Sequence, residues 1–339
     1  MPPATTQQQL LEAIYCTPED DAPRRVYADW LMARGDPRGE FIGLQLDRSR
    51  GRATPDAFAR EQTLLEQHRI AWSAPFPTSP DRVVFERGFP ARVALRLGPT
   101  TRTEVRPGPA WSTVEELFVQ HPLAEADAGA LVEFFDAPQL AGLRRVAAPL
   151  DVLEASTEAL RRWREALVLD WRWPLEGLVR LAERLPKLET IGAIATYAGE
   201  LGQLCARPHP LPARVRRLEI LWWDNGIAAS PMHQFLDLIT GSSFDEFRWV
   251  DTSCAGELRM RRTEPGPFTA VEGDLHLLED LDEPAPYDAL TQLRVLWTDE
   301  HDEADIEYAH ALAARTGAAL EFETVPSDRP LPRPGLALL

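Results

Sequence analysis

The sequence is poor in cysteine and free of long apolar runs. Its three cysteines, Cys16, Cys205 and Cys254, are odd in number and far apart, with no Cys-x-x-Cys spacing. We therefore expect buried, reduced thiols rather than a disulfide framework. No apolar run approaches the roughly 18 residues of a membrane-spanning helix. The first nine residues lack the basic and apolar regions of a secretory signal. These features predict a cytoplasmic protein without a membrane span.

Positive charge is scarce. There are 53 Asp and Glu residues against 36 Lys and Arg, which gives a net charge of −17, and Lys187 is the single lysine. Sequence-independent binding of nucleic acid depends on neutralising phosphates, so this balance argues against nucleic acid as a partner. It favours a partner protein with a basic or amphipathic surface.

Recognisable catalytic motifs are also missing. The chain has no Gly-x-Ser-x-Gly, P-loop, His-Glu-x-x-His or dinucleotide fingerprint. We expect a protein that is not an enzyme and that needs no cofactor.

The sequence does contain a regular repeat of apolar residues. Short apolar pairs of β-strand type, with one residue between the two members, recur about every 25 residues, the spacing of leucine-rich-repeat-like solenoids. The pairs are Val93/Leu95, Leu117/Val119, Val146/Ala148, Leu167/Leu169, Ile191/Ala193, Leu218/Ile220, Phe247/Trp249, Leu275/Leu277, Leu296/Thr298 and Leu320/Phe322.

Helical stretches between most of these pairs predict right-handed parallel crossovers. The expected fold is therefore α/β, a divergent leucine-rich-repeat-like solenoid with a parallel sheet. A β-hairpin over residues 82–97 would cap its first rung, and a second hairpin over residues 254–274 would replace a crossover helix. The expected domains are a helical module at 1–75, the solenoid at 76–325 and a proline-rich tail at 326–339.

The N-terminal stretch of helices carries a long motif. Asp21-Ala-Pro-Arg-Arg-Val-Tyr-Ala-Asp-Trp-Leu-Met-Ala-Arg-Gly-Asp-Pro-Arg-Gly-Glu-Phe-Ile-Gly-Leu-Gln resembles the bacterial repeat-companion domain over about residues 8–50. That family shows the string P-R-x-x-Y-A-D-W-L-x-x-x-G-D-P-x-x-E-F-I-x-L-Q. The resemblance implies a helical module placed ahead of repeats, and it implies no activity.

Polar residues of this motif allow two interpretations. Arg24, Asp29, Asp36 and Glu40 are either a recognition or catalytic cluster, or structural groups. In the second interpretation Arg24 pairs with Asp29 across helix turns and Asp36 caps the helix that begins at Pro37.

The binding surface is predicted from strand alternation. Residues between the core-facing pairs point to the concave side of a solenoid, and tryptophans gather at or beyond strand ends, either as anchors for a partner or as packing residues. The candidate protein-binding residues are Phe118, Val168, Asp170, Glu219, Leu221, Trp223, Arg248 and Trp297.

Two other functions stay open. The acidic segment Asp299–Asp305, with His301 inside it, is either a metal-dependent or enzymatic site, or a solvated helix start. Open solenoid ends would allow a structural protein to self-assemble. The sequence does not define the oligomeric state, nor whether the tail docks elsewhere or covers the last rung.

Overall fold

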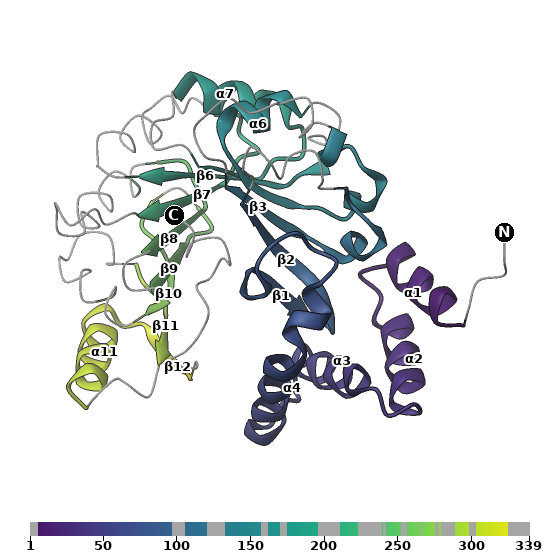
Figure 1. The fold of residues 1–339 in the computed structure, drawn as a ribbon. Coiled ribbons are helices and arrows are strands. Elements are labelled where there is room, and N and C mark those ends of the chain that lie inside the picture. The colour runs from purple at the N-terminus through teal and green to yellow at the C-terminus, as the bar shows by residue number, and fades with distance from the viewer. Residues whose placement is uncertain are drawn as a thin grey trace. The chain divides into compact units, whose positions relative to one another are not determined.

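The computed structural model describes residues 6–96, 106–120, 133–156, 162–169, 175–195, 211–222, 242–251, 256–264, 266–274, 289–297 and 303–324, together with Ile239 and Leu278. The fold is mixed α/β, with a twelve-stranded, mostly parallel sheet that does not close on itself. The chain divides into two compact units, Met1–Val146 and Ala147–Leu339. Figure 1 shows the elements along the chain.

The first unit begins with four helices, as the sequence predicts. They are α1 (Thr6–Cys16), α2 (Asp21–Met32), α3 (Pro37–Arg48) and α4 (Pro55–Ser73). The Asp36 side chain accepts a hydrogen bond from Arg38 N at 2.9 Å, which confirms the predicted cap of α3. Pro37 and Pro55 stand in first turns, where a missing N–H leaves no helical bond unmade. Capping chemistry thus fixes where these helices start.

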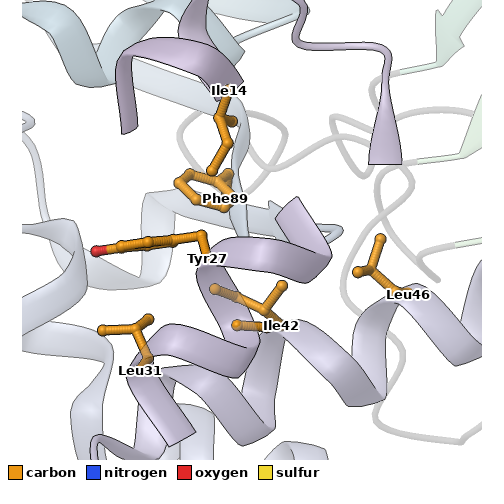
Figure 2. Packing of buried hydrophobic residues seen from close by; sticks show 7 residues of the cluster. Ile14, Tyr27, Leu31, Ile42, Leu46 and Phe89 are labelled. Carbon is orange, nitrogen blue, oxygen red and sulfur yellow. The ribbon is translucent and has the colours of Figure 1, made fainter. Parts of the chain in front are cut away.

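A small apolar core joins these helices to the following hairpin. Ile14, Tyr27, Leu31, Ile42 and Phe89 belong to one buried cluster, with α1, α2, α3 and the hairpin each contributing (Figure 2). Helices α2 and α3 approach closely at Gly39, where a Cβ atom would lie 2.6 Å from the Ala28 carbonyl oxygen. Cys16, at the end of α1, is exposed, so the expectation of buried thiols is wrong at this position.

The predicted hairpin over residues 82–97 is confirmed. Strands β1 (Val83–Glu86) and β2 (Phe89–Arg96) pair antiparallel around a turn in which Arg87 and Gly88 have φ of 52° and 81°. A 3-10 turn, η1 (Pro80–Arg82), precedes the hairpin. After the hairpin come η2 (Pro109–Thr113), β3 (Glu116–Gln120) and η3 (Pro138–Leu140). Strand β3 lies parallel to β2, in the predicted register.

Strand β4 (Arg145–Ala148) stands at the division between the units. In the second unit, strands follow one another and a described helix stands in some of the connections. Its described elements are α6 (Leu150–Ala155), β5 (Glu165–Val168), α7 (Leu175–Arg184), β6 (Thr190–Ala195), β7 (Arg217–Trp222), β8 (Glu246–Asp251), β9 (Gly256–Arg261), β10 (Ala270–Asp274), β11 (Gln292–Trp297), α11 (Glu303–Thr316) and β12 (Ala319–Thr324).

Neighbouring strands from β5 to β8 run parallel, and so do β10, β11 and β12. Strand β9 is antiparallel to both β8 and β10. The predicted hairpin in place of a crossover helix is therefore confirmed. Within the described ranges, no helix is both long enough and apolar enough to cross a bilayer.

Register is predicted correctly for the middle strands and wrongly for two others. The pairs Ile191/Ala193, Leu218/Ile220 and Phe247/Trp249 align with one another, and all of these residues are buried. In β5, however, Ala166 and Val168 align with Ile191 and Ala193, one residue away from the predicted Leu167/Leu169.

The faces are also exchanged in β11, where Leu293 and Val295 align with Leu320 and Phe322, three residues before the predicted Leu296/Thr298. Strand β10 ends at Asp274, before the pair Leu275/Leu277 that was predicted to form it. The α/β class and the mostly parallel sheet are confirmed, although the core-facing residues of β5 and β11 differ from those predicted.

Candidate binding surface

A row of charged side chains crosses six consecutive strands on one face of the sheet in the second unit. Aligned positions of β7 to β12 carry one charged residue each. We call this set the charged row: Glu219, Arg248, Arg259, Glu272, Arg294 and Glu321. Because strand residues alternate between faces, the apolar neighbours of these residues point to the opposite side.

The β7–β8 end of the charged row is largely buried. Arg248 makes a bidentate contact with Glu257, Nε to Oε1 at 2.6 Å and Nη2 to Oε2 at 2.9 Å. Its Nη1 also lies 3.7 Å from Glu219 Oε2. Burial by itself raises the pKa of a carboxyl, but the hydrogen bonds and charge of Arg248, with Arg259, hold the pKa of Glu257 below its ordinary value. Glu257 is therefore ionised over the neutral range.

In the middle of the charged row, Arg259 joins three strands. Its guanidinium lies 3.5 Å from Glu246 on β8, 3.2 Å from Glu257 on its own strand and 3.7 Å from Glu272 on β10. A planar guanidinium with several donors suits this bridging role better than an ammonium does. The contacts fix several long side chains in one arrangement across the sheet.

At the β11–β12 end, the row is exposed. Arg294 lies 3.8 Å from Glu272, 3.4 Å from Glu321 and 3.3 Å from Glu323. Side-chain exposure rises along the row from 2% at Glu219 and 12% at Arg248 to 47% at Arg294 and 69% at Glu321. Exposed ion pairs stabilise a fold little, so charge at this end is available to a partner.

Only some of the predicted binding residues belong to this surface. Glu219 and Arg248 are in the charged row, although both are largely buried. Leu221 lies on the predicted face but is fully buried, and Phe118 of the first unit, also on the face opposite its strand's core pair, is 1% exposed. The prediction that these two apolar residues are accessible is therefore wrong. Both faces of those strands are covered.

Val168 and Trp297 were predicted from incorrect registers. Val168 aligns with Ala193 and is fully buried on the core face. The register around it was predicted wrongly because the run is apolar at every position. Trp297 is paired with Thr324, two residues after the pair Val295/Phe322. Its position along the strand therefore alternates in step with the core-facing residues, and not with the predicted concave face. Asp170 and Trp223 lie outside the described residues.

For two of the tryptophans at or near strand ends, the structure decides between the anchor and the packing interpretation. Trp222 and Trp249 are buried and stack on each other, with ring centroids 5.6 Å apart and planes 20° apart. They align with the core-facing positions of β7 and β8. For these two residues, the packing interpretation is the correct one.

The polar residues of the N-terminal motif have structural contacts. Arg24 is buried and donates to the carbonyl oxygens of Pro18 at 2.6 Å and Arg87 at 3.2 Å, so the predicted pairing with Asp29 is replaced by bonds to backbone. Burial, with the nearby charge of Arg87, lowers the pKa of Arg24 to about 10. Glu40 forms an exposed two-bond ion pair with Arg60 of α4. These contacts hold the helices together.

Gln45, inside the same motif, links three elements. Its Nε2 donates to Glu61 Oε1 at 2.9 Å and to the Phe85 carbonyl at 3.1 Å, and its Oε1 accepts from Gly88 N at 2.7 Å. It thus ties α3 to α4 and to the β1–β2 turn. This role is not visible in the sequence, because the partners lie 16 to 43 residues away.

The acidic segment Asp299–Asp305 lies mostly outside the described residues, which resume at Glu303 in α11. Within the described ranges, no group of three or more His, Cys, Asp or Glu side chains is placed to hold a metal ion.

The charged row as a whole was missed from the sequence. Its signal is the pattern of Arg or Glu alternating with apolar residues, as in Glu257-Leu-Arg-Met-Arg and Leu320-Glu-Phe-Glu. Strand register is needed to see that these residues face one another. In comparisons with known proteins, no family model matches the chain and no curated protein is significantly similar to it.

Proposed function

We propose that this protein is a non-catalytic scaffold or adaptor that binds another protein through the charged row. The observation that carries the proposal is the continuity of the row over six strands, with ion pairs that pre-order its side chains. A surface whose side chains are already ordered loses less conformational entropy on binding. Paired charges also give specificity, since a partner must match their pattern.

The charge of this surface favours a basic or amphipathic partner. The ion pairs on this face join six glutamates and four arginines. The excess of carboxylates agrees in sign with the net charge of −17. Such a field attracts positively charged partners and speeds their association.

We also propose that the parallel strands are divergent leucine-rich-repeat-like rungs behind a repeat-companion module. The recurrence of strands along the chain and the capping hairpin β1–β2 support this architecture. In such an arrangement the first rung needs a cap, and the buried bonds from Gln45 to the hairpin turn would supply its attachment.

The test compares three forms of the full chain in affinity purification from native lysate. The surface variant is Glu321→Arg/Glu323→Arg, because these two carboxylates are the most exposed acidic groups among the ion pairs of this face. The matched control, Glu12→Arg/Glu66→Arg, makes the same charge change at exposed positions of the first unit. Thermal melts establish that each form is folded.

We expect a protein recovered with the wild type and the control to be lost from the surface variant. Quantitative mass spectrometry identifies it, and titration of the purified pair then measures the loss of affinity. Recovery of the same proteins by all three folded forms would refute binding through the charged row. Loss of recovery after chelation of divalent metals would favour the metal-dependent alternative.

A further inference from the structure

The guanidinium of Arg38, in the first turn of α3, has no hydrogen-bond or ion-pair partner in the described part of the chain. Its Nε atom is buried and unbonded. Arg24 and Arg262, which are buried, donate instead to backbone carbonyl oxygens. Removing a guanidinium from water without an acceptor costs free energy. The acceptor for Arg38 therefore comes from solvent or from a ligand.

Two aromatic rings hold this guanidinium in place. Its Cζ atom lies 5.3 Å from the ring centroid of Phe89 and 5.8 Å from that of Trp72, and both rings are buried. Phe89 also packs on Tyr27, with ring centroids 6.1 Å apart (Figure 2). A ring face stabilises the positive charge but does not satisfy the N–H donors in the guanidinium plane. Arg38 as a whole is partly exposed, so a ligand can reach these donors from the surface.

Two tyrosine hydroxyls add further donors near Arg38. Burial lowers the pKa of Arg38, while the charges of Tyr27 and Tyr15 act in the opposite direction, which places the three groups within electrostatic range. The Tyr27 hydroxyl accepts from Gln7 Nε2 at 3.2 Å, so its own proton remains to be donated. Burial raises the pKa of Tyr15, which is therefore a neutral donor at neutral pH. The cluster is rich in donors, and no described residue accepts from them.

The helical module is also the part of the chain where an anion meets least repulsion. Residues 6–96 contain 13 acidic and 13 basic side chains, so the whole net charge of −17 lies in the rest of the sequence. The carboxylate of Asp36 caps α3 by accepting from Arg38 N, and it makes no ion pair with the guanidinium in the described structure. The positive charge of Arg38 is thus left for an anion from outside.

We propose that Arg38, together with the hydroxyls of Tyr15 and Tyr27, binds the carboxylate group of a ligand. A carboxylate offers two coplanar oxygen atoms to the fork of guanidinium donors, and its single charge matches one arginine. Two sources carry this group, a free organic acid and an acidic side chain of another protein. The site goes beyond the proposed function, since it lies in the first unit and shares no residue with the charged row.

The probes are benzoate, as a free acid, and the peptide acetyl-Ala-Glu-Ala-amide, as an acidic side chain. Their neutral counterparts are benzamide and acetyl-Ala-Gln-Ala-amide, and phenylphosphonate tests a different oxyanion. Binding to the full chain is measured by saturation-transfer NMR at low ionic strength. The Arg38 Nε–H resonance of the wild type, assigned by its loss in Arg38→Met, reports where the probe binds.

Three variants test the residues, and thermal melts establish that each is folded. Arg38→Met removes the guanidinium at similar side-chain length, and Arg38→Lys keeps the charge but removes the paired donors. Tyr15→Phe removes one hydroxyl. The matched control Arg25→Met makes the same change at an exposed position of α2.

We expect saturable binding of at least one carboxylate, with a Kd at least roughly tenfold weaker for its neutral amide and for Arg38→Met, but not for Arg25→Met. Arg38→Lys and Tyr15→Phe should each weaken binding by roughly threefold or more. The Arg38 Nε–H resonance should shift as the probe is added. Binding of benzoate alone would identify a free acid as the source, and binding of the peptide alone an acidic side chain.

Four results would overturn the proposal. Failure of both carboxylates to bind would make Arg38 a packing residue held by its aromatic contacts. Equal binding of the neutral amides would show that the charge is irrelevant. An Arg38 Nε–H resonance that does not move, or unchanged binding by folded Arg38→Met or Arg38→Lys, would place the probe elsewhere. Tighter binding of phenylphosphonate than of benzoate would refute the carboxylate as the ligand class.

Discussion

Removal of the Gln45 amide should strongly destabilise the first unit. In Gln45→Met, a chain of similar length replaces the amide, so the loss is mainly of hydrogen bonds rather than of volume. Three bonds disappear: those with Glu61, with the Phe85 carbonyl and with Gly88 N. Gln45 and Glu61 are each 2% exposed, so water cannot readily replace the amide.

The magnitude follows from the character of each bond. The two bonds to backbone are worth about 1 kcal/mol each, and the one to the Glu61 carboxylate about 1.5–3 kcal/mol. The free energy of unfolding should therefore fall by about 3.5–5 kcal/mol. Arg48, whose Nε lies 3.0 Å from Glu61 Oε2, still pairs with that carboxylate and keeps the loss at the lower end of this range.

The assay is urea denaturation of the full chain, with hydrogen exchange at the Gly88 amide as a local probe. Gln67→Met, at an exposed position of α4, is the matched control and should change stability by less than about 0.5 kcal/mol. A loss for Gln45→Met no larger than that of the control, or an unchanged exchange rate at Gly88, would refute the reasoning.

Two further predictions concern a turn and a buried carboxylate. Gly88→Ala should lower the free energy of unfolding by about 2–4 kcal/mol in the same assay, because Gly88 has φ +81° and a Cβ would lie 2.3 Å from Ile42 Cγ1. The control Gly43→Ala, in an open helical position, should be neutral or stabilising. Equal losses of stability for the two variants would contradict this prediction. The pKa of Glu257 is held below its ordinary value of 4.5, so its ion pairs stabilise the fold above that pH and cease to do so as pH falls through the folded-state pKa. The melting temperature of Glu257→Gln should therefore lie furthest below that of the wild type near neutral pH and approach it as the pH falls below 4.5 and through the folded-state pKa. A constant gap would show that the charge is irrelevant.

How far the sequence predicted the fold depended on how clearly each strand alternates. In Leu218-Glu-Ile, a charged residue between two apolar ones shows which side faces the core, and the predicted register is correct. In Glu165-Ala-Leu-Val-Leu, the four residues after Glu165 are all apolar, so the sequence does not show which of them face the core. A slip of one residue exchanges the faces, which is why Val168 was assigned to the wrong side.

The candidate surface was harder to predict than the fold. Glu219 and Arg248 were identified singly as face residues, but their pairing depends on the alignment of β7 with β8, across 23 intervening residues. The role of Gln45 depends likewise on partners far along the chain. Local patterns predict elements and caps, whereas tertiary contacts decide which polar side chains meet.

The antiparallel strand β9 has a consequence for how the second unit folds. Four residues separate β8 from β9 and eight separate β9 from β10, whereas 23 separate β7 from β8. Since the entropy of loop closure grows with the logarithm of loop length, each of these short connections costs about 1–1.5 kcal/mol less to close than the long one. Contacts of low sequence separation also form faster. We therefore expect the three-stranded meander β8–β10 to form early, so that the parallel strands on either side add to an edge that already exists.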